Sequence, residues 1–75
     1  MQEIWTYHVE MHGPLDERAF NATSPLAVTV VQADRAATCC AVCTDQSGLI
    51  GLLRHFHRQG FVLLSIQRGP HLEGG

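Results

Sequence analysis

The stretch "YHVEMH", residues 7–12, places His8, Glu10 and His12 at every second position. Imidazoles and carboxylates are the side chains that bind metal ions and transfer protons. In a strand each residue rises ~3.3 Å, so the backbones of His8 and His12 would lie about 13 Å apart. One zinc ion cannot bridge that gap, because each ligand nitrogen must lie within ~2.1 Å of the metal. The spacing therefore excludes one site that uses all three side chains.

Four interpretations of this row stay open. The side chains can form the solvated face of a strand, or a polar patch in a subunit interface or ligand cleft. They can also belong to an active site in which Glu10 or His8 is the general base. A metal site would combine Glu10 and one histidine with Cys39 or Cys43 from a neighbouring strand.

The segment "CCAVC", residues 39–43, contains a C-x-x-C motif from Cys40 to Cys43. In a strand these two side chains point to opposite faces, and no second C-x-x-C or C-x-x-H follows. We therefore interpret the cysteines as small buried hydrophobic residues. No phosphate-binding loop, dinucleotide-binding motif or nucleophile elbow is present, so we expect neither a metal nor another cofactor.

Hydrophobic periodicity predicts the elements that position these residues. Strands are expected at 4–12, 26–32, 37–44 and 61–67, with a tight turn at 33–36. "PLDERAF" predicts one or two helical turns with Pro14 at the first position, and "NATSP" predicts a loop. A long helix is expected from about Asp45 to Gln59, capped by Thr44 or Asp45 and ended by Gly60. Its basic last turns are expected to be solvated.

This order predicts an α+β fold of the ferredoxin-like βαββαβ type with a shortened first helix. A crossover through the long helix would set the fourth strand beside the first in a four-stranded antiparallel sheet. The helices would cover one face of this sheet and leave the other open. We expect one ferredoxin-like domain at residues 1–68 and a flexible tail at residues 69–75.

Trp5, Tyr7, Val9 and Met11 are expected to face the core, with His8, Glu10 and His12 on the open face. If Val62, Leu64 and Ile66 face the helix, Phe61 and Leu63 join the open face. The candidate ligand or interface residues are therefore His8, Glu10, His12, Phe61 and Leu63.

Two segments, "DQSGLIGLL" and "GFVLLSI", resemble a group of small, mostly uncharacterised actinobacterial proteins. The resemblance spans roughly residues 7–68 and implies no assigned activity and no functional residues. The same half of the chain also resembles the strand–helix–strand core of ACT-type regulatory domains, through Asp45, Gly48 and Leu49. That second resemblance implies a regulatory domain that binds an amino acid.

Composition limits the classes of partner and the cellular location that we expect for the chain. A formal charge of −2 without a basic, aromatic-rich surface argues against nucleic acid. No apolar run approaches the ~20 residues that span a bilayer, and no signal peptide is evident, so we expect a cytoplasmic protein without membrane contact. A chain of 75 residues has a small core, which favours a homo-oligomer formed sheet to sheet or by edge pairing.

The sequence thus predicts a small, self-associating cytoplasmic module that binds a small molecule or a protein partner without catalysis. The alternative is a small cofactor-free enzyme of secondary metabolism that uses the open sheet face as its pocket.

Overall fold

The computed structural model describes the backbone of residues 3–71 and the side chains of residues 3–69. The elements, in chain order, are β1 (Trp5–His12), α1 (Glu17–Thr23), β2 (Thr29–Ala33), β3 (Ala37–Thr44), α2 (Gln46–Arg58) and β4 (Leu63–His71). This βαββαβ order confirms the predicted α+β, ferredoxin-like fold. Within the described residues, neither helix has the length and apolar character needed to cross a bilayer.

The four strands form one antiparallel sheet in the order β2-β3-β1-β4. β3 and β4, which the long helix connects, therefore lie on either side of β1, as predicted. β1 and β3 are the central strands and pair along their whole length, from Trp5 with Thr44 to His12 with Ala37. The residues of β1 are thus the ones whose side chains have neighbours on both sides.

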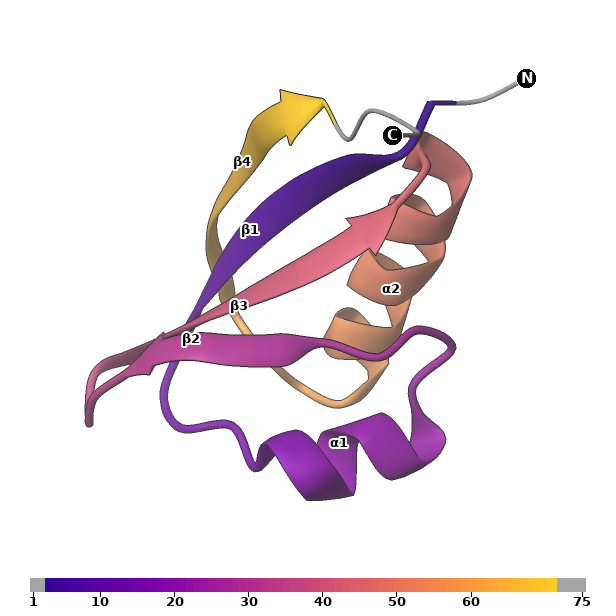
Figure 1. The fold of residues 1–75 in the computed structure, drawn as a ribbon. Coiled ribbons are helices and arrows are strands. Elements are labelled where there is room, and N and C mark those ends of the chain that lie inside the picture. Colours follow the sequence, from indigo (N-terminus) through magenta and orange to yellow (C-terminus); the bar gives the residue numbers. More distant parts are fainter. Residues whose placement is uncertain (1–2, 72–75) are drawn as a thin grey trace.

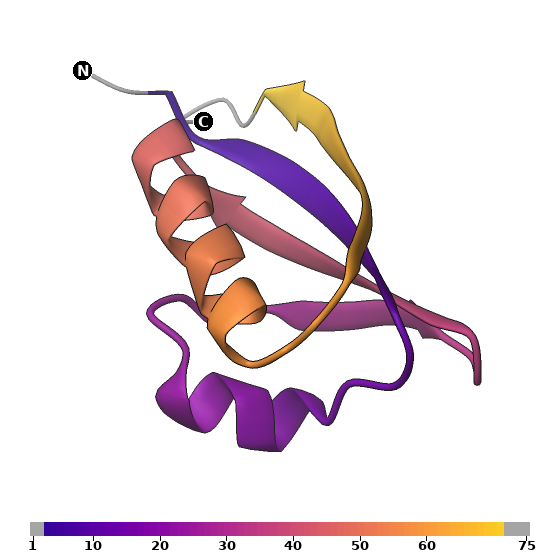
Figure 2. The ribbon, with the colours of Figure 1, turned by 180° about the vertical axis from the view of Figure 1, so that it is seen from behind.

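The two faces of the sheet differ in what covers them (Figure 1). α2 lies behind the sheet in this view, and α1 lies below it, next to β2. The view from behind shows α2 in front of the strands, with β4 on the far side of β1 from it (Figure 2). The face turned toward the viewer in Figure 1 carries no helix. The predicted open face therefore exists.

Local sequence signals place α2 where periodicity predicted it. The Asp45 side chain accepts a hydrogen bond from the Gly48 backbone N–H at 2.8 Å and caps the first turn. Gly60 has φ +86, the left-handed conformation that ends many helices and suits glycine. The buried face of the helix consists of Leu49, Leu52 and Phe56, with Leu53 packed against the same core.

The first helix begins and ends later than predicted. Its N-cap is Asp16, whose carboxylate accepts from the Ala19 N–H at 3.1 Å, so Pro14 precedes the helix. The helix then runs through Thr23 into the segment predicted as a loop. Asn21 explains this extension, because its side-chain amide exchanges two hydrogen bonds of 2.9 Å with the Val28 backbone. That tertiary contact holds the helical end in place.

The core lies between the sheet and the helices. Tyr7, Val9 and Met11 of β1 are buried, as the alternation predicted, together with Cys40 and Val42 of β3. From the helices, the Phe20 and Phe56 rings stack with centroids 4.6 Å apart. Aromatic pairs of this kind contribute about 0.5–1.5 kcal/mol beyond the area that they bury.

The predicted placement of Phe61 and Leu63 on the open face is wrong. Phe61 packs edge-on against Phe56, with ring centroids 5.8 Å apart, and Leu63 pairs with the buried Met11. A register shift between Glu10 and Met11 makes Leu64 an extra residue of β4. Because side chains alternate with a period of two, one extra residue moves the preceding side chains to the opposite face.

The ends of two strands also differ from the prediction. β4 begins at Leu63 instead of residue 61 and continues to His71, which pairs with Trp5. Residues 69–71 therefore belong to the sheet, whereas residues 72–75 of the predicted tail lie outside the described residues. β2 begins at Thr29, three residues later than predicted, because Leu26 and Val28 are engaged by Ser24 and Asn21.

The β2–β3 turn is built around Asp34. Its carboxylate accepts hydrogen bonds from the Ala36 N–H at 2.7 Å and the Ala37 N–H at 2.8 Å. These bonds favour the charged form and lower the pKa of Asp34 below its usual value. The turn fixes the register of β2 on β3 and confirms the predicted tight connection.

The two edges of the sheet are unequally protected. β2 has five residues, a register shift between Val30 and Gln32, and a Glu17 carboxylate that accepts from the Val30 N–H at 3.0 Å. β4 has nine residues, and no described helix or loop pairs with its outer edge. Its exposed apolar side chains are Val62 just before the strand, Leu64 and Ile66. Short strands, bulges and nearby charges are the usual means of preventing edge pairing. β4 has two register shifts against β1 and the charged Arg68, so it differs from β2 in its greater length and in its exposed apolar side chains.

Candidate functional site

The open face of the sheet carries a shallow hollow of about 200 Å³. Its lining comes from all four strands and consists of His8, Glu10, Gln32, Cys39, Ser65 and Gln67, here called the polar platform. Every member has a polar or ionisable group. A sheet face of this composition stays stable in water and also offers hydrogen-bonding groups to a ligand or a protein surface.

Strand register explains why residues so far apart in sequence meet here. Glu10 pairs with Cys39 on one side and with Ser65 on the other. Gln32 pairs with Cys39 in turn, so these four side chains form one row across the sheet. Directly paired residues point to the same face, with Cβ atoms about 4.5–5.5 Å apart.

A second row lies beside the first. His8 pairs with Ala41 of β3 and with Gln67 of β4. Ala41 does not line the hollow, so His8 and Gln67 are the members of this row on the platform. Farther along β1, the Thr6 hydroxyl and the Cys43 sulfur lie 3.5 Å apart, within hydrogen-bonding distance.

Glu10 has the most defined environment on the platform. The Ser65 hydroxyl donates to its Oε1 at 3.2 Å, and both side chains are half-buried. No hydrogen bond to the second carboxylate oxygen is found among the described residues, and the Glu10 side chain lines the hollow. A carboxylate held on one side and open on the other can accept a hydrogen bond or a proton from a bound molecule.

The structure brings together only part of the predicted site. His8 and Glu10 lie on the platform, whereas His12 is exposed at the end of β1 and does not line the hollow. Phe61 and Leu63 belong to the core. Among the described residues, no three histidine, cysteine, aspartate or glutamate side chains are placed to hold one metal ion. The geometry therefore does not support the metal hypothesis for Glu10, a histidine and a cysteine.

The cysteines divide between the two faces, as the C-x-x-C spacing in a strand predicted. Cys40 is fully buried in the core, and burial raises the pKa of its thiol to about 11. Cys39 is half-buried on the platform, and Cys43 is exposed near the start of α2. Two of the three thiols are therefore accessible, which corrects the interpretation of all three as buried residues.

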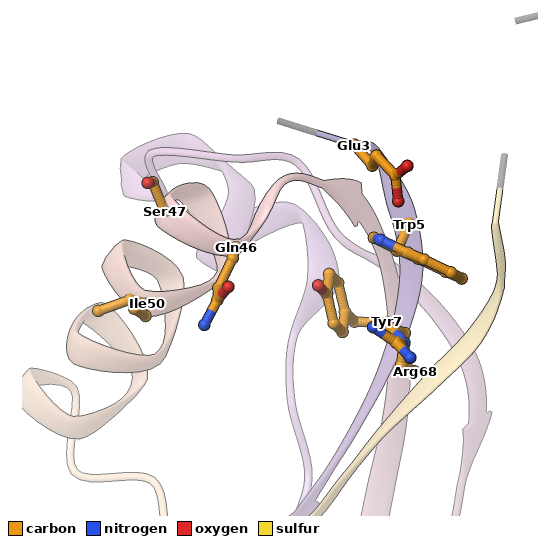
Figure 3. A pocket seen from close by; sticks show the side chains of 7 residues that line it. All are labelled: Glu3, Trp5, Tyr7, Gln46, Ser47, Ile50 and Arg68. Atoms are coloured by element: carbon orange, nitrogen blue, oxygen red, sulfur yellow. The ribbon is translucent and has the colours of Figure 1, made fainter. Parts of the chain in front are cut away.

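Sequence reasoning missed a second cavity, which lies on the helix side of the sheet. This helix-side cleft of about 340 Å³ opens between the first turn of α2 and the strands β1 and β4. Figure 3 shows the residues that line it: Glu3, Trp5, Tyr7, Gln46, Ser47, Ile50 and Arg68. The alternation predicted Trp5 and Tyr7 to face the core. Nothing in the local sequence indicated that Arg68 would join them.

His55 also differs from the prediction of a solvated helix end. Its ring lies edge-on to Phe20, with centroids 5.2 Å apart, and its Nε2 atom is buried without a described hydrogen-bond partner. The later extent of α1 explains the contact, because α1 brings Phe20 against the last turns of α2. His57, two residues on, is exposed as expected.

Comparison with known proteins agrees with the coarse part of the predicted resemblance. A family model described as "Domain of unknown function (DUF8691)" matches residues 6–67. The chain belongs to this family. The match covers β1 through most of β4, so the family is defined by the whole sheet and both helices. No curated protein and no solved structure matches the chain significantly.

Proposed function

We propose that this chain is a non-catalytic module that forms a homodimer through the β4 edge and presents two polar platforms to a small polar molecule or a protein partner. The single observation that carries the proposal is the long β4 edge, which pairs with no other described strand on its outer side and has exposed apolar side chains.

The apolar character of β4 favours a partner that is itself a strand. Val62, Leu64 and Ile66 are 61%, 50% and 43% exposed, and the edge also offers unpaired backbone N–H and C=O groups. A second strand satisfies both features, because it forms the hydrogen bonds and covers the side chains.

A second copy of this chain is the occupant that fits best. An antiparallel β4–β4 pair has two-fold symmetry, so the same apolar residues meet from both copies and the contact closes after two chains. The resulting sheet would be continuous over eight strands. The small core of the chain adds a reason for such pairing, because a 75-residue domain has little buried apolar area.

Edge pairing leaves both polar platforms accessible on one face of the extended sheet. Each platform offers an acceptor in Glu10 and an imidazole in His8. A polar ligand or a polar protein surface is the partner that these groups suit. The likeness to ACT-type regulatory domains supports a binding role of this kind, and we expect the relatives of the chain to be small actinobacterial proteins.

The cytoplasm is the compartment that we propose. Cys39, Cys40 and Cys43 are all free, although they lie within five residues of one another. A reducing environment preserves thiols in this state.

The solution mass of the untagged protein tests the edge-paired dimer. We expect a wild-type dimer by light scattering and at least a tenfold weaker association for Ile66→Lys, because lysine places charges along the paired edge. Val31→Lys is the matched control, since Val31 is 53% exposed on the opposite, protected edge. Circular dichroism on each variant checks that it is folded.

Three results would contradict the edge-paired dimer. The first is a wild-type mass that stays monomeric at every concentration. The second is dissociation by His8→Ala/Glu10→Ala with no effect of Ile66→Lys, which would place the contact on the open face. The third is an equal effect of Val31→Lys and Ile66→Lys, which would show that the β4 edge is not specific.

A cofactor-free enzyme is the second candidate, and the environment of Glu10 is the observation that favours it. With one oxygen bonded to Ser65 and the other open to the hollow, Glu10 can remove a proton from a carbon next to a carbonyl group. The test is hydrogen–deuterium exchange of small carbonyl compounds in D2O, followed by NMR. Exchange that disappears in Glu10→Gln, with the solution mass unchanged, supports the enzyme. The absence of wild-type exchange argues for the binding module.

A further inference from the structure

We infer that the helix-side cleft is a second binding site, specific for a small organic carboxylate with a flat apolar body. The inference rests on the cavity, on the Tyr7 hydroxyl at its wall and on the placement of Arg68. It does not depend on the edge-paired dimer or on the polar platform.

The size and depth of the cleft suit a small molecule. Its volume of about 340 Å³ falls at the lower end of the range for ligand pockets, ~300–1,000 Å³. The floor is aromatic, with Trp5 and Tyr7 on the same face of β1, and Ile50 adds an aliphatic side chain from α2. Ile50 is 45% exposed, so this apolar surface remains uncovered among the described residues.

The Tyr7 hydroxyl is a polar group at the wall of the cleft. The Tyr7 side chain lines the cleft and is only 7% exposed. Among the described residues, the buried side-chain atom that lacks a hydrogen-bond partner is His55 Nε2, so the Tyr7 hydroxyl is not a buried, unsatisfied group. Figure 3 shows the hydroxyl on the α2 side of the ring, with the Gln46 side chain extending toward the same space. A hydroxyl at the wall of a cleft can donate a hydrogen bond to an acceptor of a bound ligand in place of water.

Arg68 sets the charge of the ligand. Its guanidinium carbon lies 4.1 Å from the centroid of the Trp5 ring. An arginine over an aromatic face is held in place while the N–H donors at its edge remain able to bind a carboxylate through two parallel bonds.

Glu3 restricts where the negative charge can lie. Figure 3 shows its carboxylate above Trp5, at the outer end of the cleft. A bound carboxylate is therefore expected at the inner end, between Arg68 and Tyr7, with the apolar body toward Ile50. The first turn of α2 borders this space and favours negative charge there.

Benzoate is the probe, and two-dimensional NMR of the 15N-labelled chain is the measurement. We expect saturable shifts of the Trp5 indole N–H and of residues 46–50. Benzamide, which has the same shape without the charge, should bind at least tenfold more weakly. Inorganic phosphate, which has the charge without the flat body, should also bind at least tenfold more weakly.

Four variants assign the site. Arg68→Gln should weaken benzoate binding at least tenfold, Arg68→Lys by less, and Tyr7→Phe several-fold, whereas Glu3→Gln should strengthen it. Arg54→Gln is the matched control, because it removes the same charge from an exposed position of α2. Melting temperatures close to that of the wild type show that each variant is folded.

The proposal fails if benzoate gives no saturable shifts, or if Arg68→Gln and Arg54→Gln bind it equally. Equal binding of benzamide or of phosphate would also overturn it, since either result removes the specificity for an organic carboxylate. Repeating the titration with Ile66→Lys separates the two proposals, because the cleft should bind benzoate whether or not the chain is dimeric.

Discussion

The two faces of the sheet have opposite roles, although they are built from alternate residues of the same strands. On the helix side, Val9, Met11 and Cys40 are fully buried and contribute to the stability of the fold. On the open side, their neighbours Glu10, His12 and Cys39 stay accessible to solvent. Adjacent residues therefore differ in what a substitution is expected to change: a truncation on the helix side should lower stability, and a truncation on the open side should leave stability nearly unchanged.

Met11→Ala and His12→Ala are the most direct test of this difference. Met11 is fully buried, so its truncation should lower the free energy of unfolding by about 2–5 kcal/mol. His12 is exposed, and its truncation should change stability by less than about 0.5 kcal/mol. Urea denaturation of both variants measures the difference. Similar values for the two neighbours would contradict the division between the faces.

The pH dependence of stability in variants of Cys40 and Cys39 provides a second test of the difference between the two faces. The buried Cys40 thiol has its pKa raised to about 11 in the folded protein, so folding favours its neutral form. Its contribution to stability is complete below about pH 9 and is lost as the pH rises toward 11. We expect a decline of about 1–2 kcal/mol over this range, since one pKa unit corresponds to ~1.4 kcal/mol.

Cys40→Ala should flatten this alkaline decline, whereas Cys39→Ala should leave it unchanged. Urea midpoints between about pH 8 and pH 11, roughly the range in which thiols titrate, provide the measurement. Thiol labelling of the folded protein adds an independent check, because Cys43 and Cys39 should react and Cys40 should not. Rapid labelling of Cys40 would show that the helix-side face is less protected than the structure indicates.

A substitution of His55 should change stability by a smaller amount, because only its Nε2 atom is buried without a described hydrogen-bond partner. His55→Phe keeps the edge-on contact with Phe20 and removes the buried, unpartnered Nε2 atom. We expect the free energy of unfolding to rise by about 1 kcal/mol. His57→Phe, on the exposed side of the same turn, should give no gain. A loss of stability in His55→Phe would mean that Nε2 has a partner in solution.

A substitution of Asp34 should have the smallest effect on stability. It tests the register of β2 on β3, which determines the face on which each β2 side chain lies. A one-residue slip of β2 would move every one of its side chains to the other face, and the Asp34 turn opposes such a slip. Its lowered pKa means that this contribution is present above the usual carboxyl pKa and is lost as the pH falls below it. Asp34→Asn should therefore show a shallower loss of stability on acidification from about pH 4 downward. Acid titration followed by circular dichroism measures it, and identical curves would contradict the role of the turn charge.

Most of the fold was predictable because its signals are local. The alternation of "WTYHVEMH" assigned Tyr7, Val9 and Met11 to the core and His8 and Glu10 to the open face. Asp45 and Gly60 marked the limits of α2, and β3 was predicted with the bounds that the structure has. Each of these features follows from residue type and spacing alone.

The errors occurred where a distant residue decides the outcome. The side of the sheet on which Phe61 and Leu63 lie depends on a register shift against β1, and no residue of β4 marks the bulge. The end of α1 depends on the hydrogen bonds between Asn21 and Val28. The position of His55 depends in turn on Phe20 of that helix.

The sequence by itself determined the class of fold, the strand–helix order and the two-sided character of β1, because these depend on periodicity and on capping residues within a few positions. Only the tertiary structure decided which side chains share a site. Pairing placed Glu10 between Cys39 and Ser65, and the crossover through α2 brought Arg68 over Trp5. Such neighbours are set by register and packing across the sheet. The spacing of residues along one strand carries no information about which residues of the adjacent strand will pair with them.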